Sequence, residues 1–292
     1  MVMEINEKAV AEKKRIALTS VIAAVFLTAF KLVVGILTGS LGILSEALHS
    51  GLDLVAAFIT FLAVRFADQP ADEEHHYGHG KIENYSALIE TLLLFITCIW
   101  IIYEAVKRLV TGEIEIEVTY WSFAVIITSI IVDFSRSRAL YKVARKYNSQ
   151  ALEADALHFS TDIWSSTVVL IGLVGVSFNF QYADPIAALI VAVIVLGVSY
   201  RLGKRSFDAL IDRAPKEITE QIKSIVSGIK GVKDFHDLKV RESGPNKFVD
   251  LNIHVDNNMS VSEAHNISHE VEKAIRNRIA NTHVTIHIEP DE

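Results

Sequence analysis

Two apolar segments of the chain carry the same short phrase, Ala-Leu-His followed four residues after the histidine by an aspartate. The first contains His49 and Asp53, and the second contains His158 and Asp162. Residues four apart lie on one face of a helix, so each segment directs an imidazole and a carboxylate to the same side. Two such helices packed together would supply two nitrogens and two oxygens, a full tetrahedral set for an ion such as Zn²⁺.

These ligand types indicate transport of a metal ion rather than catalysis. Metal binding needs neutral imidazole and ionised carboxylate, so an arriving divalent ion displaces the protons of the site. Histidine titrates near physiological pH, which suits an exchange of metal for protons. Four protein ligands leave no position for an activated water, and His269-Glu270 lacks the second histidine of a zincin motif. We therefore expect a protein that is not an enzyme.

The segments that position these ligands are long and hydrophobic. Hydrophobic residues make up 51% of the 292 residues and concentrate in the first two thirds. Six stretches approach or reach the roughly 20 apolar residues that cross a bilayer. They lie near 16–38, 42–66, 84–108, 120–141, 152–176 and 184–201. An ionisable side chain at membrane depth costs at least ~2.5–3.5 kcal/mol, which favours a functional role; a structural polar cluster between helices is the alternative.

Basic residues follow an alternating pattern that predicts orientation. Lys and Arg precede the first predicted span and flank the connection after the second. They also run from Arg136, near the end of the fourth span, through the connection to the fifth, and they follow the sixth. The other connections carry none, and one of them contains Glu113, Glu115 and Glu117. Both termini should therefore be cytoplasmic, with the protein in the plasma or inner membrane. The single cysteine, Cys98, excludes an internal disulfide and a thiolate-rich metal site.

Other ionisable residues lie near the two phrases. Glu46, Glu153 and Asp155 would either raise the local concentration of cations or serve as interfacial residues and partners of the imidazoles. Lys31 and Glu90 are expected to pair with other helices or to extend toward the interface.

The connection after the second span holds a second candidate metal site. Asp72, His75 and His79 place one carboxylate and two imidazoles within a short stretch. Three protein ligands can close on one ion and leave an exchangeable position, which suits loading or sensing of metal. The alternative is a solvated loop whose glycines form a tight turn. His76 is the expected bystander.

From about residue 212 the chain reads as a soluble α+β domain. The periodicity predicts a helix over 217–229, strands over 232–242 and 247–256, a helix over 260–279 and a strand over 283–288. Ser260 and Glu263 have the spacing of a capping box. The sequence thus predicts a six-helix transmembrane domain, 1–211, followed by a cytoplasmic α-β-β-α-β domain, 212–292. So small a domain favours dimerisation.

Six of the eleven histidines lie in this tail domain. His236, His254 and His287 fall on three predicted strands that could be neighbours, and His265 falls on the second helix. Ordinary surface histidines are the alternative, but so many in one small domain favour a regulatory metal site.

These features resemble the cation diffusion facilitators, membrane antiporters that export zinc and related divalent ions in exchange for protons. The resemblance covers nearly the whole chain: six spans, paired aspartate motifs in the second and fifth, a histidine-bearing loop and a metallochaperone-like tail. It implies a homodimer in the lipid bilayer, with divalent metals and protons as ligands and no nucleic acid as a partner. The transport site would be His49, Asp53, His158 and Asp162.

The resemblance also assigns residues outside the spans. It implies a loop metal site at Asp72, His75 and His79, and a charge interlock between Lys81 and Asp212 that acts as a hinge. It further implies a binuclear cytoplasmic site formed by His236, His254, His265, His287 and Glu289, although relatives can have Asp at the last position.

His49 determines the expected metal, because some bacterial relatives have Asp there. A His-Asp/His-Asp set is similar to that of zinc-preferring members. Two imidazole nitrogens, which are intermediate between hard and soft ligands, together with two carboxylate oxygens favour Zn²⁺ over Mg²⁺ or Ca²⁺. Cd²⁺, Co²⁺, Ni²⁺ and Fe²⁺ remain open. A different functional class also remains open: a membrane-anchored metal sensor or partner-recruiting protein with structural metal sites.

Overall fold

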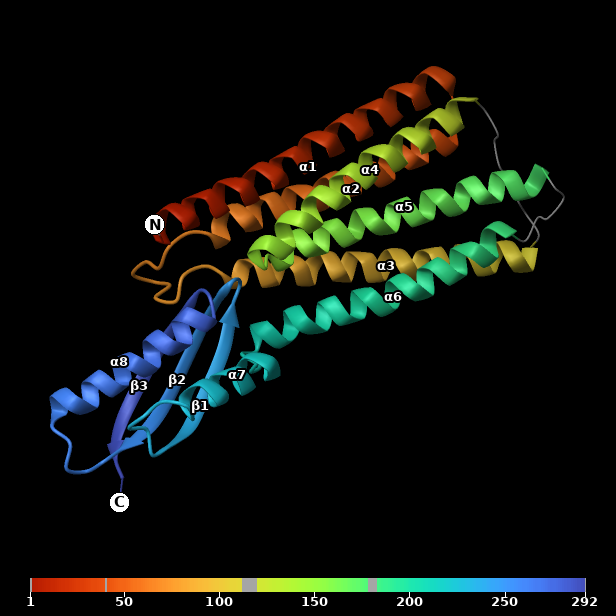
Figure 1. Cartoon of the computed structure of the whole chain (residues 1–292). Helices are drawn as coiled ribbons and strands as arrows, with labels where there is room; N and C mark the ends of the chain where they lie inside the picture. Colours follow the sequence, from red (N-terminus) through yellow and green to blue (C-terminus); the bar gives the residue numbers. More distant parts are fainter. Residues whose placement is uncertain (1, 40, 112–119, 178–182, 292) are drawn as a thin grey trace. The chain divides into compact units, whose positions relative to one another are not determined.

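A computed structural model of the chain describes residues 2–39, 41–111, 120–177 and 183–291 (Figure 1). Contacts divide the protein into two compact units. The first comprises Met1–Pro70 and Ile82–Ser206, and the second comprises Ala71–Lys81 and Phe207–Glu292. The loop that carries Asp72, His75 and His79 therefore belongs with the tail domain.

The first unit is built from six long helices that run alongside one another (Figure 1). They are α1 (Val2–Thr38), α2 (Leu41–Ala67), α3 (Lys81–Thr111), α4 (Tyr120–Tyr147), α5 (Gln150–Ser177) and α6 (Ala183–Leu210). Each helix contains one predicted span and extends beyond it at one end or both. Three segments in the described ranges are long and apolar enough to cross a membrane: Glu7–Thr38, Glu46–Ala67 and Lys81–Thr111. Residues 112–119, with the three glutamates of that connection, and 178–182 lie outside the described residues.

Alanine dominates the core of this unit. α1 packs on α2 and α4 packs on α5, with further contacts between α1 and α4 and between α2 and α5. Their shared core contains Ala17, Ala57, Ala144 and Ala156 around the larger Phe159. Small residues let helix backbones approach closely within a membrane. Large apolar side chains face outward instead, as on lipid-facing helix surfaces: Phe26 of α1, Ile96 of α3, Phe134 of α4 and Ile190 of α6.

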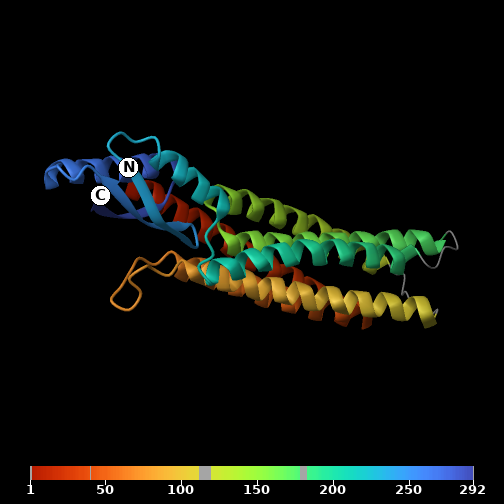
Figure 2. The ribbon, with the colours of Figure 1, turned by 90° about the horizontal axis from the view of Figure 1, so that it is seen from below.

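Helices α3 and α6 lie side by side in both views of the ribbon (Figures 1 and 2). Ala87 and Leu94 of α3 share a small core with Leu202 of α6 and with α5. A Cβ atom on Gly203 would lie 3.0 Å from Thr91 Oγ1, so glycine permits this close approach.

The second unit has the predicted order of helix, strand, strand, helix and strand. Its elements are α7 (Lys216–Val226), β1 (Asp234–Ser243), β2 (Asn246–Val255), α8 (Val261–Arg278) and β3 (Thr282–Pro290). β2 is central, antiparallel to β1 and parallel to β3. The capping box is confirmed, because Ser260 Oγ accepts from Glu263 N and the Glu263 carboxylate accepts from Ser260 N.

The two faces of this sheet differ in chemistry. α7 and α8 cover one face, where Ile222 and Ile275 pack on Leu251 and Ile253 of β2. Because side chains alternate along a strand, Asn252 and His254 project from the opposite face. The alternation thus collects polar and histidine side chains on the face away from the helices.

Candidate metal sites

The structure brings together the four intramembrane residues singled out in the sequence. His158 Nε2 lies 3.0 Å from Asp53 Oδ1 and 3.8 Å from Asp162 Oδ2. His49 Nε2 lies 3.9 Å from Asp53 Oδ1 and 3.8 Å from Asp162 Oδ1. Each imidazole therefore faces both carboxylates, one from its own helix and one from the other.

Among the described residues, His49, Asp53 and Asp162 each offer a ligand atom close enough together to hold one metal ion, and His158 lies against both carboxylates. Bonds of ~2.0–2.2 Å place neighbouring ligands of a tetrahedron about 3.3–3.6 Å apart. The observed separations of 3.0–3.9 Å bracket this range. In the part of the chain that the structure describes, His158 Nδ1 and Asp162 Oδ2 are buried without a hydrogen-bond partner. Such atoms are uncommon in folded proteins, and one of them, Asp162 Oδ2, faces the imidazole of His158 at 3.8 Å.

A cavity of about 560 Å³ reaches this site from one end of the bundle. His49 and Asp162 line it, together with residues of α3 and α6 such as Trp100 and Pro185. The lining residues of α2, α3, α5 and α6 lie toward the helix ends at Leu41, Thr111, Ser177 and Ala183. Asp53 and His158, by contrast, are almost wholly buried. The cavity therefore gives access to His49 and Asp162 from that end of the bundle.

Neighbouring carboxylates have partners other than the imidazoles. Glu46 lines the cavity and pairs with Lys31 of α1 at 3.1 Å. Glu153 pairs with Arg205 of α6 at 2.9 Å. Lys31 thus pairs with another helix, one of the two arrangements expected for it.

A buried arginine was missed by the sequence reasoning. Arg136 lies inside α4 and is almost wholly buried, whereas the sequence grouped it with the basic residues of a connection. Its guanidinium donates to Asp133 Oδ1 at 3.2 Å and to Ser20 Oγ at 3.1 Å, and it stacks 3.5 Å above the Phe159 ring. The spacing of Asp133 and Arg136, three apart in an apolar helix, was the signal that could have revealed it.

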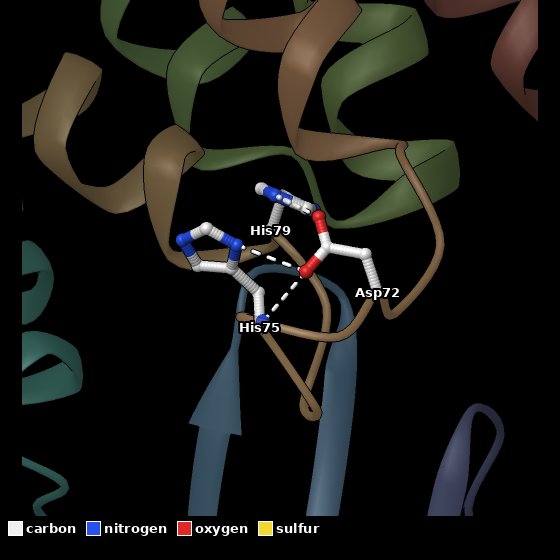
Figure 3. Close-up of side chains that lie close together, drawn as sticks. All are labelled: Asp72, His75 and His79. Atoms are coloured by element: carbon white, nitrogen blue, oxygen red, sulfur yellow. Dashed lines mark hydrogen bonds and ion pairs between the residues drawn. The ribbon is translucent and has the colours of Figure 1, made fainter.

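The loop residues also converge (Figure 3). Asp72 Oδ1 accepts from the backbone N of His75 at 2.6 Å and lies 3.1 Å from His75 Nδ1, while Asp72 Oδ2 lies 3.4 Å from His79 Nε2. The hydrogen bond from His75 N is the main cause of a lowered pKa of Asp72, so its carboxylate is ionised near neutrality. These three residues fit one ion with an exchangeable position. His76 instead lies 3.1 Å from the Glu73 carbonyl.

Contacts with the hairpin formed by β1 and β2, called the tail hairpin below, hold this loop, and the sequence did not predict them. The Tyr77 ring meets the Phe248 ring edge to face at 5.1 Å, and the Arg241 guanidinium lies 4.0 Å from the Tyr77 centroid. A Cβ atom on Gly80 would lie 2.3 Å from Ser243 O, so the backbones touch there. Glycine next to a functional loop was the available signal for this approach.

The two residues of the expected interlock are in contact. Lys81 Nζ lies 2.9 Å from Asp212 Oδ1 and donates to the Leu210 carbonyl at 3.2 Å. Asp212 has a positive φ of 58° at the end of α6, and Arg241 approaches its carboxylate at 3.9 Å.

Glu289 is the centre of the tail cluster. His236 Nε2 lies 3.0 Å and His254 Nε2 3.5 Å from Glu289 Oε2, and His287 Nε2 lies 3.5 Å from Glu289 Oε1. The register explains this, because β2 pairs His254 with Glu289 and Asn252 with both His236 and His287. The hydrogen bond with Glu289 raises the pKa of His236, and the same bond lowers the pKa of Glu289.

His265 is placed apart from this cluster. It lies on α8, where its ring stacks on that of His269 at 5.6 Å. Among the described residues, the metal-sized group in the tail contains His236, His254 and Glu289. The remaining tail histidines have local partners: His269 pairs with Glu272 at 2.9 Å and His283 stacks on Phe248.

Comparison with known proteins agrees with this architecture. A family model described as the cation efflux transmembrane domain matches residues 17–211, and one described as the cation efflux protein cytoplasmic domain matches residues 214–291. The cation-efflux pump FieF of Cronobacter sakazakii is 34% identical over 283 residues, covering 94% of this chain and 92% of the relative. An uncharacterized transporter of Methanocaldococcus jannaschii is 35% identical over 269 residues, covering 92% and 93%.

Among solved structures, the metal-bound C-terminal domain of the CzcD transporter from Thermotoga maritima is 29% identical, covers 26% of this chain and 88% of that chain, and has a TM-score of 0.25. The two family matches together span almost the whole sequence, and the two relatives named above, which match more than nine tenths of it, are described as a cation-efflux pump and a transporter. The chain belongs to the cation diffusion facilitator family and is a membrane transporter for the efflux of divalent metal cations.

Proposed function

We propose that this protein exports Zn²⁺ from the cytoplasm in exchange for protons, with His49, Asp53, His158 and Asp162 as the transport site. The observation that carries the proposal is the convergence of two imidazoles and two carboxylates from α2 and α5. Two nitrogen and two oxygen ligands at these separations suit Zn²⁺ better than Mg²⁺ or Ca²⁺, which take six or more oxygens. Cd²⁺, Co²⁺, Ni²⁺ and Fe²⁺ are the competing cargoes.

Proton exchange follows from the ligands themselves. Without metal, His158 and Asp53 face each other at 3.0 Å, and a proton on the imidazole satisfies both. An arriving ion needs that nitrogen lone pair and so displaces the proton. Release of the ion on the other side lets the proton return.

Alternating access is supported by the single-sided cavity. It connects His49 and Asp162 with the end of the bundle near Thr111 and Ser177, the outer side in the proposed topology with cytoplasmic termini in the plasma or inner membrane. On the other side of the site the helices close around buried residues such as Phe159 and Leu152. The described conformation is thus outward-facing, and transport requires a second conformation open to the cytoplasm.

The other two clusters are proposed to regulate this cycle. Asp72, His75 and His79 would load or sense metal, and His236, His254, His287 and Glu289 would bind regulatory metal. His265 lies on α8, which covers the opposite face of the sheet, so we assign it to the same site only through a second copy of the chain. Lys81 and Asp212 are partly exposed, so their pair would contribute below ~1 kcal/mol and act by position as a hinge.

The test is flux into proteoliposomes that contain a zinc-sensitive dye, driven by an imposed pH gradient. Wild-type vesicles should accumulate Zn²⁺ only with the gradient, while His49→Ala and Asp162→Ala vesicles should lose at least about tenfold in rate, because each lacks a ligand. His76→Ala, a histidine outside all three clusters, is the matched control and should transport normally. Zinc binding without gradient-driven flux in the wild type would instead identify a metal sensor.

A further inference from the structure

Three carboxylates outside the metal site are wholly buried among the described residues of the helix bundle, and one of them, Glu83, pairs with Lys13. Glu90 of α3 and Asp155 of α5 have no exposed surface. One oxygen of each accepts a hydrogen bond from a hydroxyl group, Glu90 Oε1 from Thr60 and Asp155 Oδ2 from Ser20. The other oxygens, Glu90 Oε2 and Asp155 Oδ1, are buried and have no hydrogen-bond partner within the described ranges.

The charges around Glu90 do not balance. Asp155 is the charged group of α5 that acts on it, and the two carboxylates repel each other when both are ionised. Two cationic groups act on Asp155: Arg136 of α4, whose guanidinium already binds Asp133 and Ser20, and His158 of α5 when its imidazole is protonated. Near Glu90 the other neighbouring groups are neutral: the hydroxyl of Thr60 from α2, that of Ser86 one turn earlier in α3, and the side chain of Leu202 from α6. The cation that α1 presents to α3, Lys13, binds Glu83 about two turns away. Arg136 thus acts on several buried carboxylates, Asp155 and Asp133 among them, whereas the charged group that acts on Glu90 within the described ranges is itself a carboxylate.

Such an arrangement stores a proton. An ionised carboxylate without a partner in a protein interior carries a large desolvation penalty, which is relieved when the group is protonated. A single proton on one of two interacting buried carboxylates also removes the repulsion between them. The unpartnered Glu90 Oε2 is an atom on which that proton can reside.

The pair lies between the metal site and the closed end of the bundle. At 1.5 Å per residue, Asp155 is about 7.5 Å from the start of α5, and His158 follows it by about one helical turn. Glu90 is about 13.5 Å from the start of α3. Both helices begin at the end opposite to that from which the cavity enters.

We propose that Glu90, opposed by Asp155, is a proton carrier that is not a metal ligand, and that it releases its proton when a divalent ion occupies the transport site. This inference rests on the proposed exchange of metal for protons and adds a second source of protons to it. A positive ion held by His158, which lies about one helical turn from Asp155, would favour ionised carboxylates in the pair. The Glu90 O–H bond then breaks, its electrons stay on the carboxylate, and the proton passes to water when the closed end opens.

The experiment counts the protons released per bound Zn²⁺. Calorimetric titration of the full-length protein in detergent, in buffers of different ionisation enthalpy, gives this number. All variants carry His75→Ala and His236→Ala, so that zinc binding reports the transport site. Glu90→Gln preserves shape and hydrogen bonding but cannot ionise, so it should release fewer protons, by up to about one per ion. Glu90→Asp should retain the release, and Glu153→Gln, a change at a carboxylate that pairs with Arg205 and does not line the cavity, should match the reference protein.

A proton count for Glu90→Gln equal to that of the reference would overturn the inference, even if stability or zinc affinity fell, because a structural role changes those without changing the count. If Glu90→Gln does not fold, Asp155→Asn serves instead, since removal of the opposing charge should also lower the count. Absence of gradient-driven flux in wild-type vesicles would overturn the antiport itself, whereas the count in detergent tests Glu90 independently of flux.

Discussion

His158 Nε2 lies 3.0 Å from Asp53 Oδ1, and the two residues are 105 positions apart in the chain. The contact joins α5 to α2 at a depth where both side chains are almost wholly buried. The alanine-rich packing of these helices brings the two motifs within hydrogen-bonding distance. The same pair of atoms can hold either a proton or a metal ion, which is the physical requirement for exchange.

Asp53→Asn tests this dual role, because the amide keeps the size of the side chain and removes its charge. A neutral oxygen is a weak ligand for Zn²⁺, so we expect zinc affinity at the transport site to fall at least about tenfold, or ~1.4 kcal/mol. Calorimetry on the full-length protein with the loop and tail sites removed by His75→Ala and His236→Ala measures this change. An unchanged affinity would show that Asp53 positions His158 without binding the metal.

His49→Asp tests the choice of metal. The substitution converts a set of two nitrogens and two oxygens into one nitrogen and three oxygens, which is harder in ligand character. We expect the preference for Zn²⁺ over Mn²⁺ in vesicle flux to decrease, with Cd²⁺, Co²⁺ and Fe²⁺ as further competitors. His79→Asp, the same change in the loop site, should leave the selectivity of transport as it is. If His49→Asp and wild type showed equal selectivity, His49 would not be the residue that determines the preference of the transport site for Zn²⁺.

The sequence allowed much of this architecture to be predicted, because its signals are periodic and local. The elements of the tail domain followed from alternation and from the Ser260–Glu263 capping box, which the structure reproduces. The two His-x-x-x-Asp motifs also identified which helices must meet. Such inferences depend on residues close together in the chain, where helix and strand geometry fixes direction.

The contacts that the sequence did not reveal join segments far apart. Nothing near Tyr77 indicates that its ring meets Phe248, and nothing near Lys13 indicates Asp68 or Glu83 as partners. Basic residues at the ends of apolar spans usually face water, so the burial of Lys13 and Arg136 contradicts the pattern used to read them. Three-dimensional packing determines such pairs, and a single sequence carries no direct record of it.

The tail site should depend on pH through His236. Its hydrogen bond with Glu289 raises its pKa, so protonated His236 stabilises the metal-free fold below its ordinary pKa of about 6.5, and this contribution is lost as pH rises through the raised value. Zinc needs the neutral imidazole, so tail affinity should increase over the same range. Glu289→Gln should lower the pKa of His236 toward its ordinary value, measured by NMR of labelled histidine in the full-length protein.

The matched control for that change is Glu272→Gln. Glu272 contacts His269 on α8 at 2.9 Å and does not contact His236 in the described structure. It should therefore leave the titration of His236 unaltered. If both variants shift His236 equally, the local hydrogen bond is not the cause of its raised pKa.

Gly80→Ala should detach the metal loop from the tail hairpin. The added Cβ would lie 2.3 Å from Ser243 O, and relief of such a clash costs about 1–3 kcal/mol. Cleavage within residues 71–81 by a protease should become faster, and zinc should protect the loop less. Gly197→Ala is the control, because its Cβ would meet no atom within 4 Å. Slow cleavage of Gly80→Ala, equal to wild type, would show that the close approach does not hold the loop.

Lys13→Met should destabilise the helix bundle, because Lys13 of α1 binds both Asp68 and Glu83, which bracket the metal loop. All three side chains are almost wholly buried, so loss of the cation leaves two carboxylates uncompensated, at a cost of about 3–5 kcal/mol. Unfolding of the full-length protein in a denaturing detergent measures this loss. Adding Glu83→Gln should recover part of it, since one buried charge is then removed. Lys14→Met, at the next and more exposed position, should unfold like wild type. An equal loss of stability in Lys13→Met and Lys14→Met would mean that the loss of one positive charge, rather than the buried ion cluster, determines stability.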